Sequence, residues 1–364
     1  MMTKLKKRSK KKKLGIITWH DHNNPGGSLQ AFALLTAINN LGYSARIINY
    51  HQTHRSQFKR CIKWFISTLT SNLPHKYYYP YEEFYGKYYK LTKEYLPNTI
   101  GGKLEKFDCI ISGSDQIWAP NVFDPNYMLE CYHGKKISYA ASIGLNYIPD
   151  NLVEKYTELL SDYTAISVRE SIGVELIKTR CGLKSKVVLD PTLLLETKDY
   201  RKMQKPYYNI KKPYVFCYFL NENNDYESVV NNCAESKGFH VCGISKDISN
   251  SEWINILDKV GPCEFLWLID NASIVLTDSY HGSIFSLLFS KPLVLFERFD
   301  ENSSINQNSR IYQLVEYFNI PCRERLGKNV YEMLSETDYK NFDITLSSLK
   351  NESFMFLREA LKSC

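Results

Sequence analysis

The chain has 364 residues, which is enough for two domains that each bury a hydrophobic core. Its 44% hydrophobic and 23% charged residues exclude a disordered or fibrous protein and indicate an ordinary globular one. No apolar run is long enough to span a bilayer, and the stretch 14–18 is too short for the apolar part of a secretory signal. We therefore expect a cytoplasmic protein.

The net charge of +7 is concentrated at the start of the chain. Residues 4–13 hold eight basic side chains, so the remainder has 46 − 8 = 38 basic against 39 acidic residues, a net of −1. A near-neutral body argues against a nucleic-acid-binding protein with a broad basic face. We predict that residues 1–13 form a disordered arm, with peripheral contact to anionic lipid head groups as the second interpretation.

The ten cysteines are scattered and include no C-x-x-C pair. Several, such as Cys109 and Cys217, lie inside apolar strand patterns. This placement predicts reduced thiols buried in the core, in keeping with a cytoplasmic compartment.

The first half of the chain alternates strands with helices. Residues 14–19 and 45–50 have strand patterns and flank a helical pattern over 28–41 that stops at Gly42. This is a β-α-β unit, the building block of a parallel sheet. Further elements are predicted as strands at 107–112, 136–141, 165–168 and 186–189 and a helix at 171–181.

Residues 51–100 interrupt this alternation with many Tyr, Phe and Lys side chains. The segments 58–69 and 77–96 favour an aromatic-rich helical insertion. We expect it to pack over a cleft edge. An acceptor-binding surface is the alternative, because Tyr and Trp rings suit sugar rings.

A second set of elements follows the polar segment 199–213, which contains Pro206 and Pro213 and is predicted to be a linker. The predicted strands are 214–220, 240–244, 272–278 and 291–296, and the predicted helices are 226–237, 262–270, 284–289, 311–318 and 347–362. The sequence thus predicts an α/β protein with two Rossmann-like domains, 14–198 and 214–345, whose parallel sheets face a cleft. A C-terminal helix within 346–364 completes it.

His281 lies where the strand 272–278 turns into the next helix. Ligands of α/β proteins bind at such carboxyl ends of strands, and the free N–H groups of a helix start, here near Gly282 and Ser283, favour an anion. A titratable imidazole beside an anion site suits a phosphoryl-bearing substrate. A satisfied structural histidine at a strand end is the alternative.

The first β-α-β unit offers weaker signals. Gly26 and Gly27 open a helix and could cradle a phosphate, although a plain tight turn is equally compatible. The pattern is not G-x-G-x-x-G, and no acidic residue ends the second strand, which disfavours a dinucleotide. His20 and His22 could bind a metal, but the sequence supplies no third ligand at a sensible spacing.

Three charged residues complete the candidates. Asp115 follows a strand directly and could orient a sugar hydroxyl or act as a base, with a helix N-cap as the alternative. Arg169 and Arg310 could each bind a carboxylate or phosphate of a ligand through two hydrogen bonds. An ion pair to a neighbouring acidic residue is the alternative.

Seven segments carry a resemblance that runs from about residue 14 to residue 320. They are Gly26-Gly-Ser-Leu-Gln30, residues 107–118 ending in Ser-Gly-Ser-Asp-Gln-Ile-Trp118, residues 138–142, 167–170, 188–192, 277–282 and 308–310. Together they resemble the polysaccharide pyruvyl transferase family. The resemblance implies a GT-B-like pair of Rossmann domains and transfer of a pyruvyl group from phosphoenolpyruvate to a hexose of a glycan. The products would be a cyclic ketal and phosphate.

On this basis we expect His281 and Asp115 to be catalytic, with Asp278 as a further carboxylate that orients the acceptor. The expected donor-binding residues are Arg169, Arg310, Ser279, Gly282 and Ser283. The expected acceptor-binding residues are Gly26, Gly27, Gln30, Ser114 and Trp118. Position 279 is a departure, because some family members carry an Arg there that is thought to hold the donor.

The expected partners are phosphoenolpyruvate and a surface polysaccharide or lipid-linked glycan, with no cofactor, no metal and no nucleic acid. Two other functions stay open. One is a glycosyltransferase that uses a nucleotide-sugar donor on a similar fold. The other is a non-catalytic glycan-binding protein.

Overall fold

The structure is a computed structural model that describes residues 11–52, 79–221, 225–235, 237–245, 247–248, 250–299, 306–320 and 338–364. Most of the predicted basic arm and the predicted helix 58–69 lie outside these residues. The arm ends one residue earlier than expected, because Lys13 already opens the first strand and its backbone N–H donates to Asp108 (2.6 Å).

The first sheet has six parallel strands in the order β3-β2-β1-β4-β5-β6. The strands are β1 (Lys13–Ile17), β2 (Ser44–Tyr50), β3 (Leu91–Tyr95), β4 (Cys109–Ser112), β5 (Lys136–Ser138) and β6 (Tyr163–Ala165). This is the doubly wound order of a Rossmann sheet, and the direction of winding reverses between β1 and β4. A ligand site is therefore expected beyond the carboxyl ends of these two strands.

Helix α1 (Pro25–Asn40) begins three residues earlier than its hydrophobic pattern predicts. Asn24 caps it by accepting a hydrogen bond from the N–H of Gly27 (3.1 Å), and Pro25 occupies the first helical position. The remaining elements of this half are α4 (Pro97–Ile100), η1 (Pro120–Val122), α5 (Asp150–Ser161), β7 (Ser167–Val168), α6 (Ser171–Cys181), β8 (Lys186–Val187) and η2 (Pro191–Leu193). The short strands β7 and β8 pair with each other.

The aromatic segment is not wholly helical, contrary to our expectation for 77–96. Helix α3 (Pro80–Tyr88) covers its first part, and β3 then joins the edge of the first sheet by pairing with β2. The half-buried pattern of β3 suits an edge strand, whose outer face stays in water. Tyr85 and Tyr89 stack on each other and are buried, so part of the aromatic segment belongs to the core.

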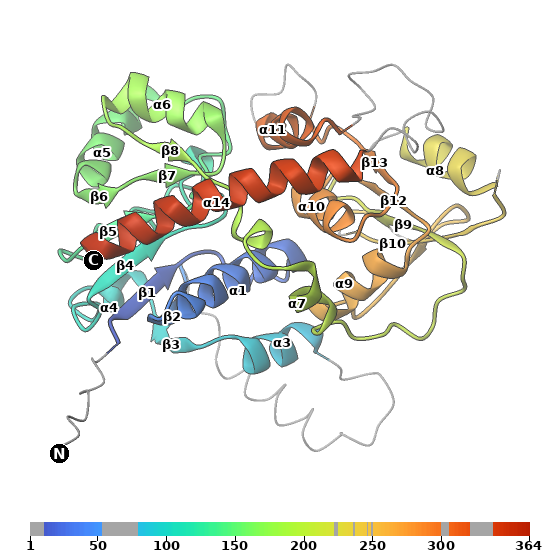
Figure 1. The fold of residues 1–364 in the computed structure, drawn as a ribbon, viewed down its shortest axis with the longest axis horizontal. Coiled ribbons are helices and arrows are strands. Elements are labelled where there is room, and N and C mark those ends of the chain that lie inside the picture. Colours follow the sequence, from blue (N-terminus) through green and yellow to red (C-terminus); the bar gives the residue numbers. More distant parts are fainter. Residues whose placement is uncertain are drawn as a thin grey trace, which may run out of the picture.

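The second sheet has five parallel strands in the order β11-β10-β9-β12-β13. Its elements are β9 (Tyr214–Tyr218), α8 (Tyr226–Glu235), β10 (His240–Ile244), β11 (Asn255–Ile256), α9 (Pro262–Asn271), β12 (Ile274–Thr277), α10 (Tyr280–Leu288), β13 (Leu293–Leu295) and α11 (Ser309–Phe318). Here the winding reverses between β9 and β12. The prediction of two Rossmann-like halves is confirmed (Figure 1).

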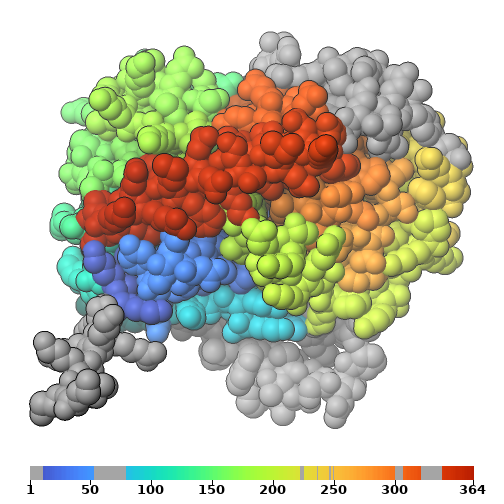
Figure 2. Space-filling view, viewed as in Figure 1, coloured from blue at the N-terminus to red at the C-terminus, as the bar shows by residue number. Residues whose placement is uncertain are grey.

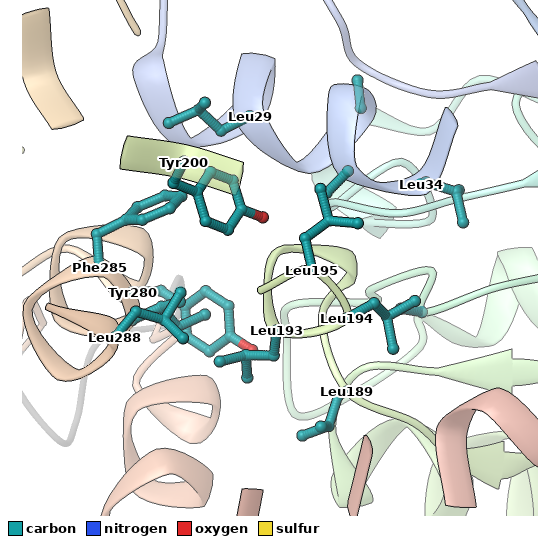
Figure 3. Packing of buried hydrophobic residues seen from close by; sticks show 14 of the residues in the cluster. Leu29, Leu34, Leu189, Leu193, Leu194, Leu195, Tyr200, Tyr280, Phe285 and Leu288 are labelled. Carbon is teal, nitrogen blue, oxygen red and sulfur yellow. The ribbon is translucent and has the colours of Figure 1, made fainter. Parts of the chain in front are cut away.

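One hydrophobic core runs through both halves. Leu193, Leu194 and Leu195 lie between α1 of the first half and α10 of the second (Figure 3). Tyr200, in α7 (Thr197–Arg201), packs edge-to-face on Phe285 at 5.0 Å between ring centroids. The predicted linker 199–213 thus begins inside helix α7, which Tyr200 ties to the core. Because this apolar surface leaves water only when the halves are in contact, it holds them together.

The C-terminal helix α14 (Tyr339–Ser363) is longer than predicted and crosses both halves (Figures 1 and 2). At its start the hydroxyl of Tyr339 donates to the carbonyl of Lys291, beside β13. Near its end the carbonyl of Leu361 accepts from the hydroxyl of Tyr43, beside β2 (3.3 Å). Across the described residues, no helix combines the length and the apolar surface that a membrane span requires.

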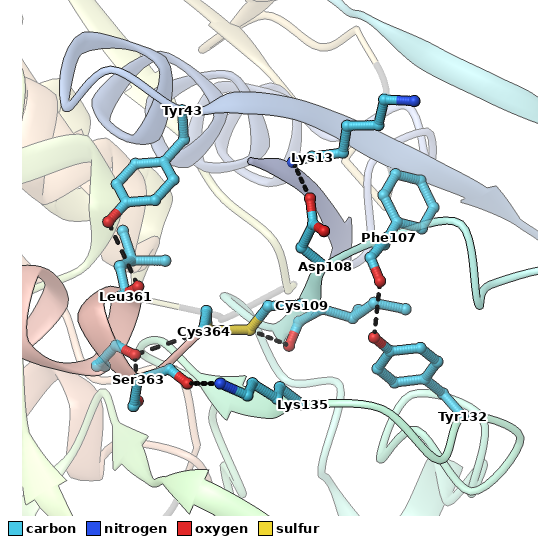
Figure 4. Close-up of a disulfide and its surroundings, with 12 residues drawn as sticks. Lys13, Tyr43, Phe107, Asp108, Cys109, Tyr132, Lys135, Leu361, Ser363 and Cys364 are labelled. Carbon is cyan, nitrogen blue, oxygen red and sulfur yellow. Dashed lines mark hydrogen bonds between the residues drawn. A yellow bond between two sulfur atoms is a disulfide. The ribbon is translucent and has the colours of Figure 1, made fainter. Parts of the chain in front are cut away.

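A disulfide joins the end of α14 to the centre of the first sheet. Cys364 pairs with Cys109 of β4 (Cα–Cα distance 5.4 Å), so the prediction of a reduced Cys109 is wrong (Figure 4). The sequence pattern could not reveal this pair, because the two residues are 255 positions apart and only the docking of α14 brings them together. Cys217 is a free buried thiol, as expected.

We expect Cys364→Ser to lower the free energy of unfolding by about 2–4 kcal/mol, since the bond restricts a very long loop in the unfolded chain. Urea unfolding without reductant measures this change. Cys131→Ser, which alters a free cysteine, is the control. Reductant should bring the wild type down to the stability of Cys364→Ser; equal stability of the two proteins before reduction would contradict the role of the bond.

Candidate functional site

A cavity of about 360 Å³ lies between the two halves, a size that suits a small ligand. Trp19, Asn24 and Asp115 border it from the loops after β1 and β4. His281 and Arg310 border it from α10 and α11. The cavity therefore joins the reversal points of both sheets, where open α/β sheets bind their ligands.

His281 contacts both halves of the molecule. It lies in the first turn of α10, which Ser279 caps, and its ring packs against the first turn of α1. A Cβ atom added to Gly26 would come within 2.4 Å of this ring. Gly26 is therefore required for close packing against the imidazole rather than for a phosphate cradle. Gly27, the next residue, borders the cavity itself.

Asp190 is a buried carboxylate that the sequence analysis did not single out. It follows β8 and accepts from the N–H and the hydroxyl of Thr192 (2.9 and 2.7 Å). Its other oxygen lies 3.4 Å from Nε2 of His281 and 2.9 Å from Arg169. Although burial raises the pKa of the Asp190 carboxyl, the positive charges of His281 and Arg169 hold it well below its usual range. The available signal was an acid directly after a predicted strand.

Arg169 is buried behind the cavity wall and does not border the cavity. Its guanidinium contacts Asp190 at 2.9 Å, Asp115 at 3.6 Å and Glu170 at 3.9 Å. The ion-pair alternative thus describes Arg169 well. Its charge is compensated within the protein, and its position suits it to hold Asp190 and Asp115 in place.

Arg310 has the opposite environment. It borders the cavity with 9% of its surface exposed, and its guanidinium donates to the carbonyl and Oε1 of Gln307 (3.4 and 3.2 Å). Within the described ranges, no carboxylate lies within ion-pair distance of it. Burial, followed by repulsion from Arg169, lowers the pKa of Arg310 to about 10, so it remains charged at neutral pH. Glu170 and Asp115 offset its charge only from beyond ion-pair distance. A buried cation in this position favours an anionic ligand.

Tyr280 and Arg298 also border the cavity on the side of Arg310. The ring of Tyr280 lies 4.6 Å from the guanidinium carbon of Arg169 and 5.9 Å from that of Arg310, within the range of cation–π contact. Arg298 also borders the cavity and donates from Nε to Asn221 (3.2 Å). As with Arg310, no described carboxylate lies within ion-pair distance of its guanidinium, although Asp278 lies close enough for its charge to act on Arg298. The sequence analysis missed Arg298, whose signal was a basic residue just after the strand predicted at 291–296.

The two acidic candidates differ. Asp115 has φ = 75°, borders the cavity, and accepts from the N–H of Gln116 (2.9 Å). No helix begins there, so the N-cap interpretation does not hold. Asp278 borders the cavity but accepts from the N–H groups of Leu220 and Asn221 and from the hydroxyl of Tyr226. It fixes the loop after β9, and burial raises the pKa of its carboxyl.

Comparison with known protein families shows to which family the chain belongs. The family model described as polysaccharide pyruvyl transferase matches residues 24–300. The chain belongs to this family. A comparison with the curated proteins gives no match.

Solved structures support the fold of this family member. The UDP-GlcNAc 2-epimerase of Methanocaldococcus jannaschii is 17% identical, with 90% of this chain and 95% of that chain covered and a TM-score of 0.54. The epimerase of Rickettsia bellii is 11% identical, with 96% of each chain covered and a TM-score of 0.52. A variant of the wall teichoic acid polymerase TagF is 8% identical, with 97% and 90% covered and a TM-score of 0.50. At these identities the likeness shows the GT-B-like fold alone, as predicted.

The start of α10 in this pyruvyl transferase family member offers fewer free N–H groups than expected. The N–H of Gly282 donates to Oγ of Ser279 (3.3 Å), and that of Ser283 donates to the carbonyl of Ser279 (2.9 Å). Neither Gly282 nor Ser283 borders the cavity. The helix cap therefore occupies the groups that we expected to bind an anion, and the arginines are the remaining candidates.

Three of the expected acceptor residues lie behind the cavity wall. Nε2 of Gln30 donates to Thr18, to Trp19 and to Gly27 (each 3.0 Å), which ties the loop after β1 to α1. Ser114 is buried and donates to the carbonyl of Ala140 (2.9 Å). Trp118 is fully buried and donates to Ser112 (3.0 Å). These residues support the wall rather than line it.

The structure also separates the two histidines that the sequence offered as metal ligands. His22 borders the cavity, where its ring contacts Trp19 edge-to-face. His20 is buried and faces Asn49 and His51 instead. The sequence pattern treats the two histidines alike. The fold of the loop after β1 decides which way each side chain points.

We expect Gly26→Ala to displace the His281 ring and to lower the midpoint of urea unfolding, because its added Cβ has no room. An overpacked site of this kind costs about 1–3 kcal/mol. Gly86→Ala is the matched control: it lies in α3 with open space around it, and we expect no loss there. Equal midpoints for Gly26→Ala and the wild type would refute the close packing.

Proposed function

We propose that this protein transfers a pyruvyl group from phosphoenolpyruvate to two hydroxyls of a hexose on a surface polysaccharide or lipid-linked glycan. The products are a cyclic ketal and inorganic phosphate. One observation carries the proposal: a charged Arg310, which has no ion-pair partner in the part of the chain that the structure describes, borders the same cavity as a histidine beside a buried aspartate. Family membership supports a transferase of this kind.

The donor is a small molecule with a carboxylate and a phosphate, so it needs at least two cationic contacts. Arg310 and Arg298 both border the cavity and can supply them. Arg298 would take over the charge that some relatives place at position 279, where this chain has Ser279. Arg169 would act indirectly by holding Asp190 and Asp115.

His281 is the proposed base. A proton on Nε2 would be held by Asp190, which leaves Nδ1 to remove the proton of an acceptor hydroxyl. The methylene carbon of the donor gains a proton, and the neighbouring carbon becomes electrophilic. One acceptor hydroxyl adds to that carbon as it loses its proton, phosphate then leaves with the bonding electrons, and the second hydroxyl adds in its place as it loses its proton. Of the two hydroxyl protons, one balances the proton gained by the methylene carbon and the other leaves with the phosphate. Asp115 would orient the acceptor or accept the second proton.

The acceptor would enter along the side of the cavity that the loop after β1 forms. Trp19, His22 and Asn24 border the cavity there, and an indole face with polar neighbours suits a sugar ring. We also propose that the protein works in the cytoplasm without a cofactor, and that the basic residues 4–13 draw it to an anionic membrane carrying the acceptor.

The direct test incubates the protein with phosphoenolpyruvate and glycan acceptors and follows phosphate release and the mass gain of a pyruvyl ketal. We expect His281→Ala to lower the turnover number by about 10²–10⁴-fold, the usual contribution of a general base. His240→Ala removes an exposed histidine in β10 and should leave turnover unchanged.

Two outcomes would overturn the proposal. Release of a nucleoside diphosphate from a nucleotide-sugar donor, with none of the ketal formed, would indicate a glycosyltransferase. Glycan binding without turnover, unchanged in His281→Ala, would indicate a binding protein.

For Arg310→Gln we expect two effects of opposite sign. Affinity for phosphoenolpyruvate should fall at least about tenfold, because charge-assisted hydrogen bonds are lost. The ligand-free variant should unfold at the same temperature as the wild type or higher, since the change removes a buried charge that has no ion-pair contact among the described residues. Thermal unfolding with and without phosphoenolpyruvate measures both.

Arg180→Gln, at a more exposed arginine of α6, is the matched control and should keep the ligand-induced shift. An Arg310→Gln variant with an undiminished shift would contradict the proposed donor site.

A further inference from the structure

A second cluster of polar side chains lies beside the cavity and takes no part in the proposed transfer. His20 and Asp21 follow β1, and Asn49 and His51 stand at the end of β2. Because β1 and β2 are parallel neighbours, their carboxyl ends bring these residues together. One ligand atom from each of His20, Asp21 and His51 can be chosen so that all three lie within 4.8 Å of one another, and all three residues are buried.

The contacts of the cluster favour a proton on Nδ1 of each histidine ring. Nδ1 of His20 lies 3.2 Å from the carbonyl of Thr18, which can only accept, so Nδ1 is the protonated nitrogen. Nδ1 of His51 lies 3.4 Å from the carboxylate of Asp21, which favours a proton there too. In the neutral rings, both Nε2 atoms then carry lone pairs.

These two lone pairs point to the same place. Nε2 of His20 lies 3.1 Å from Oδ1 of Asn49, and Nε2 of His51 lies 3.0 Å from the same oxygen. Two ring nitrogens and an amide oxygen thus converge. With protons on both Nδ1 atoms of neutral rings, all three would offer lone pairs, and a cation among them could form three coordination bonds.

The outer contacts fit the same conclusion. Histidines that bind metals almost always donate their other ring N–H to a carboxylate or a backbone carbonyl. His51 has Asp21 in that position and His20 has the carbonyl of Thr18. The hydroxyl of Tyr89 further fixes this loop by donating to the carbonyl of His20 (3.1 Å).

We propose that this protein binds one divalent transition-metal ion of the Zn²⁺ type through Nε2 of His20, Nε2 of His51 and Oδ1 of Asn49. Asp21 orients His51 and contributes a compensating negative charge. Two imidazoles and one oxygen select Zn²⁺ or Co²⁺ over Mg²⁺ and Ca²⁺, which prefer oxygen ligands alone.

The metal would anchor the loop after β1 to β2. That loop continues through Trp19, His22 and Asn24, which border the cavity, to Gly26, against which His281 packs. The site is therefore structural support for the acceptor wall. It does not depend on the identity of the transferred group.

The competing explanation is that the side-chain amide of Asn49 is rotated by 180°, which exchanges its oxygen and its NH₂ group. If Asn49 presented its NH₂ group to the two rings, it would donate to both Nε2 atoms and satisfy the cluster without a metal. The two explanations differ in one measurable quantity, the metal content of the protein.

The test uses the full chain, freed of metal with a chelator, dialysed, and titrated with Zn²⁺ or Co²⁺ alone. We expect one equivalent of metal per chain, a Co²⁺ absorption spectrum typical of imidazole ligands, and a higher unfolding temperature in Zn²⁺. His51→Ala should bind at least about tenfold more weakly, and Asp21→Asn about 10–100-fold more weakly through loss of the orienting carboxylate. His240→Ala should bind as the wild type does.

The Co²⁺ spectrum of the wild type keeps the test decisive if His51→Ala fails to fold. Absence of a stoichiometric site in the wild type, or equal binding by a folded His51→Ala variant, would overturn the proposal in favour of the rotated amide. Since binding is measured without phosphoenolpyruvate, this result is independent of the transfer assay.

Discussion

The contact between His281 and Gly26 is the constraint on which the rest of the site depends. It joins the first turn of α10 to the first turn of α1, and therefore the second sheet to the first. The contact exists only because position 26 has no side chain. The buried leucines 193–195 and Tyr200 hold the two helices at this distance over a larger apolar surface. The imidazole thereby reaches the reversal points of both sheets.

Charge is divided unequally around this contact. Arg169 and Asp190 lie behind the wall and, with Asp115 at the cavity edge, form a compensated group, whereas Arg310 borders the cavity with no carboxylate at ion-pair distance among the described residues. A buried guanidinium such as that of Arg310, which lacks an ion-pair contact among the described residues, adds no stability to the folded protein. Arg310 is thus better explained by an anionic ligand than by folding. Its position indicates that this cavity is a ligand site and not a packing defect.

The fold is shared with enzymes that the comparisons describe as UDP-GlcNAc 2-epimerases and as a teichoic acid polymerase. Fold alone does not choose among their chemistries. The chemistry of this chain must therefore be argued from the content of its cavity: a histidine beside a buried aspartate, Arg310 and Arg298, and a Ser279 that caps its own helix. The crossing of α14 and its disulfide to β4 add a clamp over the joined halves.

The sequence by itself determined the two parallel sheets, because the spacing of apolar residues and the capping signals act over a few residues. It also selected His281 and Asp115, which follow strand ends, and Arg310, which lies at a helix start. It could not reveal Asp190 as the partner of His281, the compensation of Arg169, the pairing of His20 with His51, or the Cys109–Cys364 bond. Those contacts join residues distant along the chain, and only the packing of the two halves and of α14 decides which of them meet.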